Sequence, residues 1–363
     1  MSPRYVILKV HLYLGLAAAV FLLILSATGT VMAFEHDIER WVAPRLWLVT
    51  VGRRPLPEDE LIRIAQAAFS PARVASVQIS PRADVVHVMQ MTDHAAVYVN
   101  PWDGTINGRI VGPTRTQRYI GYIHQLHLRL LPVPRSAPSL AGPGKLVVSF
   151  AGLILCALVP TGLILWWRAR RASIRLTGSW FRICFDAHQA LGIYACIFLF
   201  VAAFTGVMVG FDFAEGAIYA VMHSPPPNRP RPPQASDANG RPFITVDQAM
   251  AVARGAVPDG IVTQVQTPAN PKAVFVVQLR TPREVSVDSP IPVTVYVDPY
   301  SAVPIRVQDL FAESPGYRMV RLNRAIHTGD YWGLPGHILT SLSSFLLGVM
   351  VITGLVIWGK KLT

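Results

Sequence analysis

The chain has 363 residues, of which 52% are hydrophobic and 15% are charged, and its mean hydropathy is +0.38. This apolar content is concentrated in a few long stretches, which excludes an ordinary soluble domain and a disordered chain. The net charge of +12 lies largely beside those stretches, so we do not predict nucleic acid binding.

Four stretches are apolar over a length that can cross a bilayer, which takes about 20 residues. The first is too long for a signal-peptide core and has no clear small-residue cleavage site, so we predict that it is retained. The predicted transmembrane helices are 6–34, 146–167, 187–211 and 336–358. The remaining segments are two predicted small α+β domains, a short connector and a tail: 35–145, 212–335, 168–186 and 359–363.

Basic residues gather at one end of the predicted spans. The N-terminus, the 168–186 connector and the C-terminus together carry nine Lys and Arg residues against one acid, Asp186. Because Lys and Arg accumulate on the cytoplasmic side, both termini and the connector are predicted to be cytoplasmic. The segments 35–145 and 212–335 are then on the outer side of the membrane.

The sequence repeats itself, which predicts a tandem duplication. "VYVNPWDGTINGRI" (97–110) matches "VYVDPYSAVPIRV" (295–307), and each follows a helix-like stretch, which predicts one helix on a small antiparallel sheet. The first and third spans match at an offset of 177, and the second and fourth both contain Thr-Gly. We interpret the Thr-Gly pairs as small residues that let helices approach closely. The Pro-rich stretch 225–234 is typical of a linker.

Four histidines occupy matched positions at the ends of the spans. His11 matches His188 at the predicted cytoplasmic ends, and His127 matches His327 just outside the membrane. An isolated histidine there would be an interfacial side chain or a partner in an interhelical hydrogen bond. Two such pairs, related by a duplication, instead favour one six-coordinate metal between each pair, with a porphyrin supplying the other four ligands. A zinc or copper site would want three or four protein ligands.

We therefore predict two non-covalent b hemes with bis-histidine ligation, since no CxxCH motif for covalent attachment is present. His124 competes with His127, but at the offset of 200 it is His127 that matches His327. His124 and His337 remain reserve ligands. Arginines on the same predicted helices could bind the heme propionates or form a stripe facing solvent and lipid headgroups: Arg118, Arg318, Arg321 and Arg324.

The chain resembles the PepSY-associated transmembrane proteins over nearly its whole length. The residues that carry the resemblance are "VHLYLGL", "YVNPWDG", "LHLRLL", "TGLILWW", "AHQALGI", "VYVDPY", "IHTGDYWGLPG" and "TGLVIWG". Several such proteins resemble siderophore-iron reductases of the bacterial inner membrane. The resemblance implies a heme-containing oxidoreductase that passes electrons to a ferric siderophore in the periplasm and releases Fe(II). The family's usual His-Arg-x-x-Gly reads His188-Gln189-Ala190-Leu191-Gly192 in this chain.

Two other functions compete with this hypothesis. A heme-free, membrane-anchored PepSY module could bind a periplasmic peptide, peptidase or transporter by adding a strand to a sheet edge. A permease is disfavoured because no span interior holds an Asp, Glu, Lys or Arg. Without a GxGxxG fingerprint after a strand, the electron donor is predicted to be a membrane quinol or a separate cytoplasmic reductase.

Overall fold

The computed structural model describes residues 2–130, 141–170, 172–226, 232–283 and 292–360. The chain forms two compact units, and it passes between them several times. The helical unit comprises residues 1–35, 119–223 and 319–363, and the sheet unit comprises residues 36–118 and 224–318. The predicted linker, connector and tail lie partly outside the described residues, at 227–231, Arg171 and 361–363 respectively.

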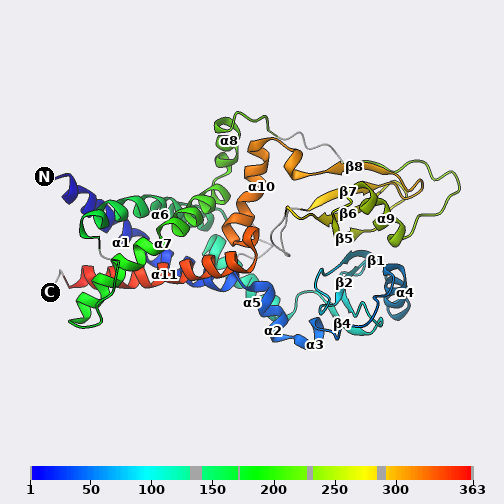
Figure 1. The fold of residues 1–363 in the computed structure, drawn as a ribbon, viewed down its shortest axis with the longest axis horizontal. Coiled ribbons are helices and arrows are strands. Elements are labelled where there is room, and N and C mark those ends of the chain that lie inside the picture. Colours follow the sequence, from blue (N-terminus) through cyan, green and yellow to red (C-terminus); the bar gives the residue numbers. More distant parts are fainter. Residues whose placement is uncertain (1, 131–140, 171, 227–231, 284–291, 361–363) are drawn as a thin grey trace. The chain divides into compact units, whose positions relative to one another are not determined.

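Four long helices build the helical unit (Figure 1): α1 (Pro3–Met32), α6 (Ala141–Ala169), α7 (Trp180–Gly210) and α11 (Leu334–Gly359). All four are long and apolar enough to cross a membrane, which supports the predicted multi-pass membrane protein. Each reaches beyond at least one of the predicted ends, because polar residues such as Arg4 and Arg182 continue the helix past the apolar run.

The four helices form a ring in which each packs against two neighbours. α1 contacts α6 and α11, and α7 also contacts α6 and α11, so α1 and α7 lie diagonally across the bundle. Nine buried apolar side chains fill its centre, among them Leu22, Leu155, Leu199 and Leu347. Hydrogen bonds from Ser26 and Ser344 to each other's backbone carbonyls join α1 to α11, at O···O distances of 2.7 and 3.1 Å.

Three shorter helices complete the helical unit: α5 (Arg115–Arg129), α8 (Asp212–Val221) and α10 (Pro315–Thr328). The sequence placed these segments inside the two outer domains, 35–145 and 212–335. In the structure, α8 and most of α5 and α10 belong with the membrane helices instead. α5 and α10 reach the bundle through His127 and His327, and Asn323 of α10 also donates a hydrogen bond to the Thr205 carbonyl at 3.0 Å.

The sheet unit contains one continuous eight-stranded antiparallel sheet, with the order β4-β3-β2-β1-β5-β6-β7-β8 (Figure 1). The strands are β1 (Val74–Gln78), β2 (His87–Met91), β3 (Ala95–Val99), β4 (Ile106–Val111), β5 (Ile261–Gln266), β6 (Phe275–Arg280), β7 (Val293–Val297) and β8 (Pro304–Gln308). Strands β1 and β5 pair through Ser76–Gln266, Val77–Val265 and Gln78–Gln264. The two predicted α+β domains therefore share one sheet, because the edge strands of the two modules pair with each other.

Each module contributes the predicted helix to its half of the sheet. α4 (Glu58–Ala68) packs on β1 and β3, and α9 (Val246–Ala256) packs on β5, β6 and β7. The two helices also cap each other's first turns. The Asp59 carboxylate accepts hydrogen bonds from the backbone nitrogens of Val246 and Asp247 at 2.9 and 3.3 Å. The Asp247 carboxylate accepts from Glu58 and Asp59 at 3.2 and 3.0 Å, so the modules are joined by polar contacts as well as by the sheet.

Candidate functional site

The four matched histidines form two facing pairs. His11 of α1 and His188 of α7 have ring centroids 6.4 Å apart and ring planes at 88°. His127 of α5 and His327 of α10 have ring centroids 6.3 Å apart and ring planes at 58°. We call these the α1/α7 pair and the α5/α10 pair. The structure thus brings together the residues that the repeat had matched.

The two pairs lie at opposite ends of the bundle. On α1, His11 belongs to one pair and Thr28 contacts the other, and on α7 His188 and Thr205 do the same. Seventeen residues separate the two sites along each helix, which at 1.5 Å per residue is about 25 Å. That separation approaches the roughly 30 Å hydrocarbon thickness of a bilayer, so each site lies near one end of the membrane-spanning helices.

A threonine holds each ring of the α5/α10 pair. His127 Nδ1 lies 2.8 Å from Thr28 Oγ1, and His327 Nδ1 lies 2.9 Å from Thr205 Oγ1. The two threonines come from α1 and α7, the diagonal helices of the ring. Each short helix is therefore fixed to a membrane helix through its histidine.

The α1/α7 pair repeats this arrangement with the other two helices. His11 Nδ1 lies 2.9 Å from Thr161 Oγ1 on α6. His188 Nδ1 lies 3.2 Å from Thr353 Oγ1 on α11 and 2.9 Å from the Met350 carbonyl oxygen. All four Thr-Gly motifs within the four long helices therefore contact a histidine of one of the two sites.

These contacts fix the tautomer of the imidazoles. Each threonine hydroxyl donates its single hydrogen to the backbone carbonyl four residues earlier, as Thr28 does to Ile24 at 2.7 Å. The hydroxyl oxygen can then only accept from the histidine, so Nδ1 carries the hydrogen. Nε2 keeps its lone pair, and no protein group within the described ranges forms a hydrogen bond to it. An imidazole in this state is a metal ligand.

The glycine after each threonine leaves room for the ring. A Cβ added at Gly162 would lie 3.1 Å from His11 Cε1, and one at Gly29 would lie 3.3 Å from His127 Cε1. The corresponding distances are 3.3 Å from Gly206 to His327 and 3.4 Å from Gly354 to His188. The interpretation of Thr-Gly as a close-packing motif therefore missed its second use, which is to hold a histidine. The recurrence of a Thr-Gly seventeen residues after both His11 and His188 was the signal available in the sequence.

Burial keeps the α5/α10 imidazoles neutral. Burial, together with the nearby charges of His327 and His124, lowers the pKa of His127 to about 4. Burial also lowers the pKa of His327. Both helices lie outside the four membrane-spanning segments. Because the pKa of each ring is lowered, both imidazoles are available in the neutral form that binds metals.

The spacing of each pair fits a single metal ion held between two imidazoles. A ring nitrogen binds a metal at about 2 Å and lies roughly 1 Å in front of the ring centroid, so trans ligands have centroids about 6 Å apart. Among the residues that the structure describes, no three His, Cys, Asp or Glu side chains gather as a metal site. Two protein ligands per metal suit a macrocycle that supplies the other four.

A cavity of about 600 Å³ surrounds the α1/α7 pair. Its volume lies within the range of about 300–1,000 Å³ that is usual for small-molecule sites. Four glycines line it, namely Gly15, Gly162, Gly192 and Gly354, together with many apolar side chains. Gly15 and Gly192 follow His11 and His188 by one turn, and a side chain at either would fill the space beside the imidazoles.

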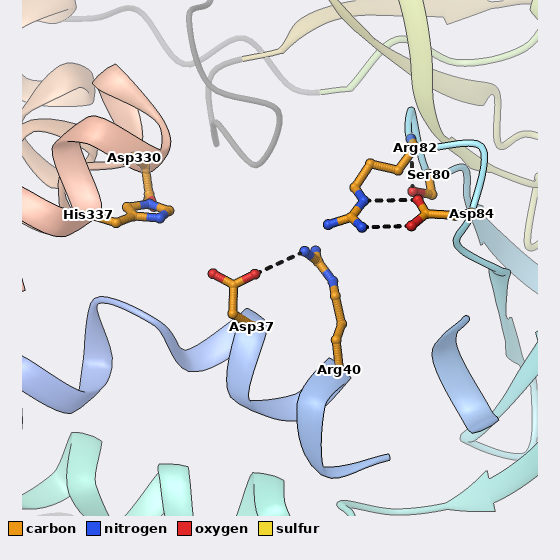
Figure 2. Close-up of polar contacts among 7 residues, drawn as sticks. All are labelled: Asp37, Arg40, Ser80, Arg82, Asp84, Asp330 and His337. Carbon is orange, nitrogen blue, oxygen red and sulfur yellow. Dashed lines mark hydrogen bonds and ion pairs between the residues drawn. The ribbon is translucent and has the colours of Figure 1, made fainter. Parts of the chain in front are cut away.

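The reserve histidines are engaged elsewhere. His124 Nε2 lies 3.2 Å from Glu35 Oε2. His337 Nε2 lies 2.8 Å from Asp330 Oδ1 (Figure 2). The ring of His337 also packs against Phe34. Neither faces a second histidine in the ring contacts of the described residues, so the geometry favours His127 over His124.

The candidate arginines are solvent-accessible. Arg118, Arg321 and Arg324 are exposed and Arg318 is partly exposed, and none of the four forms an ion pair within the described residues. Other arginines already have acidic partners. Arg82 holds Asp84 through two hydrogen bonds of 3.1 and 2.8 Å, and Arg40 lies 3.5 Å from Asp37 (Figure 2). An anion would therefore bind more readily to the four candidate arginines, which have no acidic partner among the described residues.

Comparison with known proteins identifies one family. The family described as PepSY-associated TM region matches residues 8–361. No curated protein matches the chain. The matched range includes all four paired histidines and all four Thr-Gly motifs, so both sites lie within the region that defines the match.

Proposed function

The chain belongs to the PepSY-associated TM region family, and from this premise we propose that it is a diheme b-type cytochrome of the membrane that delivers electrons to a ferric siderophore. The observation that carries the proposal is the pair of facing imidazoles at each end of the bundle, each anchored through Nδ1 and open at Nε2. A heme-free binding module would have no use for four such anchors.

The residues present fit two hemes. His11 and His188 would hold one heme, and His127 and His327 would hold the other. When bound, heme supplies a one-electron redox couple. The protein's part is to hold the imidazoles, fix their tautomer through Thr28, Thr161, Thr205 and Thr353, and keep water out of the space between the sites with the apolar bundle core.

The four candidate arginines would serve the α5/α10 site and the outer face of the protein. Arg321 and Arg324 lie six and three residues before His327 on α10, on neighbouring turns. Guanidinium groups bind carboxylates in a planar fork, so propionates are suitable partners. Arg118 and Arg318 are proposed for the same role at the beginnings of α5 and α10.

We place the chain in a bacterial inner membrane, with both termini in the cytoplasm and the sheet unit in the periplasm. The distribution of Lys and Arg supports this orientation. The matching order of one helix and four strands in each half of the sheet supports a tandem duplication. The α1/α7 site is then cytoplasmic and the α5/α10 site periplasmic.

A ferric siderophore is the proposed electron acceptor. Siderophores bind Fe(III) through hard oxygen ligands, and Fe(II) is held less strongly by such ligands, so adding one electron loosens the metal. The products are Fe(II) and the free chelator. The donor is a membrane quinol or a separate reductase, because the sequence carries no dinucleotide-binding fingerprint.

The test is stopped-flow absorbance in sealed vesicles whose protein has been reduced from the cytoplasmic side. Mixing with ferric siderophores on the other side should oxidise the heme and produce Fe(II) that a ferrous chelator traps. The His188→Ala variant should lose electron transfer from the inner donor. A ferric siderophore should still oxidise its α5/α10 heme if that heme was reduced beforehand, because that site keeps both of its ligands.

Iron-free siderophore is the control for non-specific oxidation. If the heme stays reduced with every ferric chelate tried, the siderophore is not the acceptor. If the chain purifies without colour from heme-supplied cells, the cytochrome itself is excluded and the heme-free binding module replaces it.

A further inference from the structure

The cavity around the α1/α7 pair has one charged end. Arg4, Leu8, His11 and Gly15 are spaced by four, three and four residues on α1, so they share one face of the helix, and all four line the cavity. Arg4 lies seven residues from His11, which is about 10 Å along the helix axis. Towards the other end, the lining is apolar, with Leu22, Leu155 and Leu347.

Arg4 has no partner in the protein to explain its charge. Within the described residues it forms no ion pair or hydrogen bond, and no acidic residue lies in the first turn of α1. Its neighbour Lys9 differs, since its ammonium lies over the rings of Tyr5 and Tyr13 at 5.5 and 5.7 Å. Lys9 also does not line the cavity, so only Arg4 presents positive charge to it from this helix.

A second polar group of the cavity is also without a partner. Gln189 lines the cavity directly after His188, and its Oε1 is buried without a hydrogen bond. Within the described residues no hydrogen bond involves its side chain at all. A buried carboxamide without a partner is unfavourable, so a ligand that hydrogen-bonds to it is favoured. A carboxamide can donate through Nε2 to a carboxylate.

We propose that the α1/α7 cavity takes a flat ligand that bears carboxylates, and that Arg4 and Gln189 bind those carboxylates at the cavity's charged end. This inference rests on the proposed function, under which the ligand is heme. Arg4 and Gln189 would bind carboxylates at the α1/α7 site, as the four candidate arginines of α5 and α10 are proposed to do at the α5/α10 site. Arg4 lies outside the residues that match the family, so this part of the site is assigned from the cavity alone.

The test uses heme and heme dimethyl ester, which differ only in the charge of the carboxylates. Both are titrated into the full-length apoprotein carrying His327→Ala, so that binding reports on the α1/α7 cavity. The chain with Arg4 should prefer heme over its ester by about tenfold or more. Arg4→Ala should abolish most of that preference, and Lys9→Ala, which removes the same charge outside the cavity, should keep it. Gln189→Leu should reduce it, and Gln125→Leu, which removes another buried unpaired carboxamide, should not.

A second measurement avoids the His327→Ala background. In the otherwise unchanged chain, resonance Raman spectra should show a shifted propionate bending band in Arg4→Ala and an unshifted band in Lys9→Ala. If heme binds but Arg4→Ala and Lys9→Ala behave alike in both measurements, the inference is overturned while the cytochrome stands. If the wild-type chain binds no heme, the proposed function itself has failed.

Discussion

Replacing His127 or His327 with alanine should remove one of two hemes and leave the other. Under the proposed function two histidines would hold each heme, so losing one would remove half of the protein ligands of that site. The α1/α7 pair is about 25 Å away along the helices, and its ligands and threonines are untouched. His11→Ala and His188→Ala should produce the complementary loss. The measurement is the heme content of each purified variant by pyridine hemochrome, with reduced-minus-oxidised spectra to identify the site that remains.

His124→Ala and His337→Ala are the matched controls, because each removes a neighbouring histidine that is engaged with an acid instead of a facing ring. Both should keep the full heme content. Loss of heme in His124→Ala with retention in His127→Ala would show that the pairing of His127 with His327 is wrong.

Thr28→Val should weaken heme binding at the α5/α10 site by about 10–100-fold, the usual effect of removing a group that orients a metal-binding histidine. Valine keeps the shape of threonine but cannot accept the hydrogen bond from His127 Nδ1, so the ring loses its fixed tautomer and orientation. Thr28→Ser keeps the hydroxyl and should restore most of the affinity. Heme titration of the apoprotein measures the affinity, and a redox titration of the site gives an independent readout.

Thr30→Val is the control for this experiment. Thr30 lies on the same helix and also donates to the carbonyl four residues earlier, at 2.7 Å, but within the described residues it forms no hydrogen bond with a histidine. Equal heme affinity and equal redox behaviour in Thr28→Val and Thr30→Val would contradict the role assigned to the threonines.

Much of the helical unit could be predicted from the sequence, because a run of about 20 apolar residues has few alternatives in a folded protein. The repeat in the sequence also predicted the pairing of the histidines, since the matched positions face each other in the structure. His127 was separated from His124 in this way, and the structure places His124 against Glu35.

Other features could not be predicted because they depend on which segments meet in space. The two strands that join the modules, β1 and β5, show no strict alternation, because their buried valines lie three residues apart, and no such pattern says which strand pairs with which. The joining of β1 to β5 was therefore missed, and two domains were expected where there is one sheet. The threonines were missed for a similar reason. A Thr-Gly in an apolar helix has a sufficient explanation in helix packing, and only the fold reveals that a histidine from another helix lies beside it.

The most direct test of the account is the amount of heme in the wild-type chain. Protein expressed with heme available should contain two non-covalent b hemes per polypeptide by pyridine hemochrome, extractable into acidified organic solvent, with the spectrum of six-coordinate low-spin iron. A heme content near zero under the same conditions would contradict the claim that the two histidine pairs are heme-binding sites.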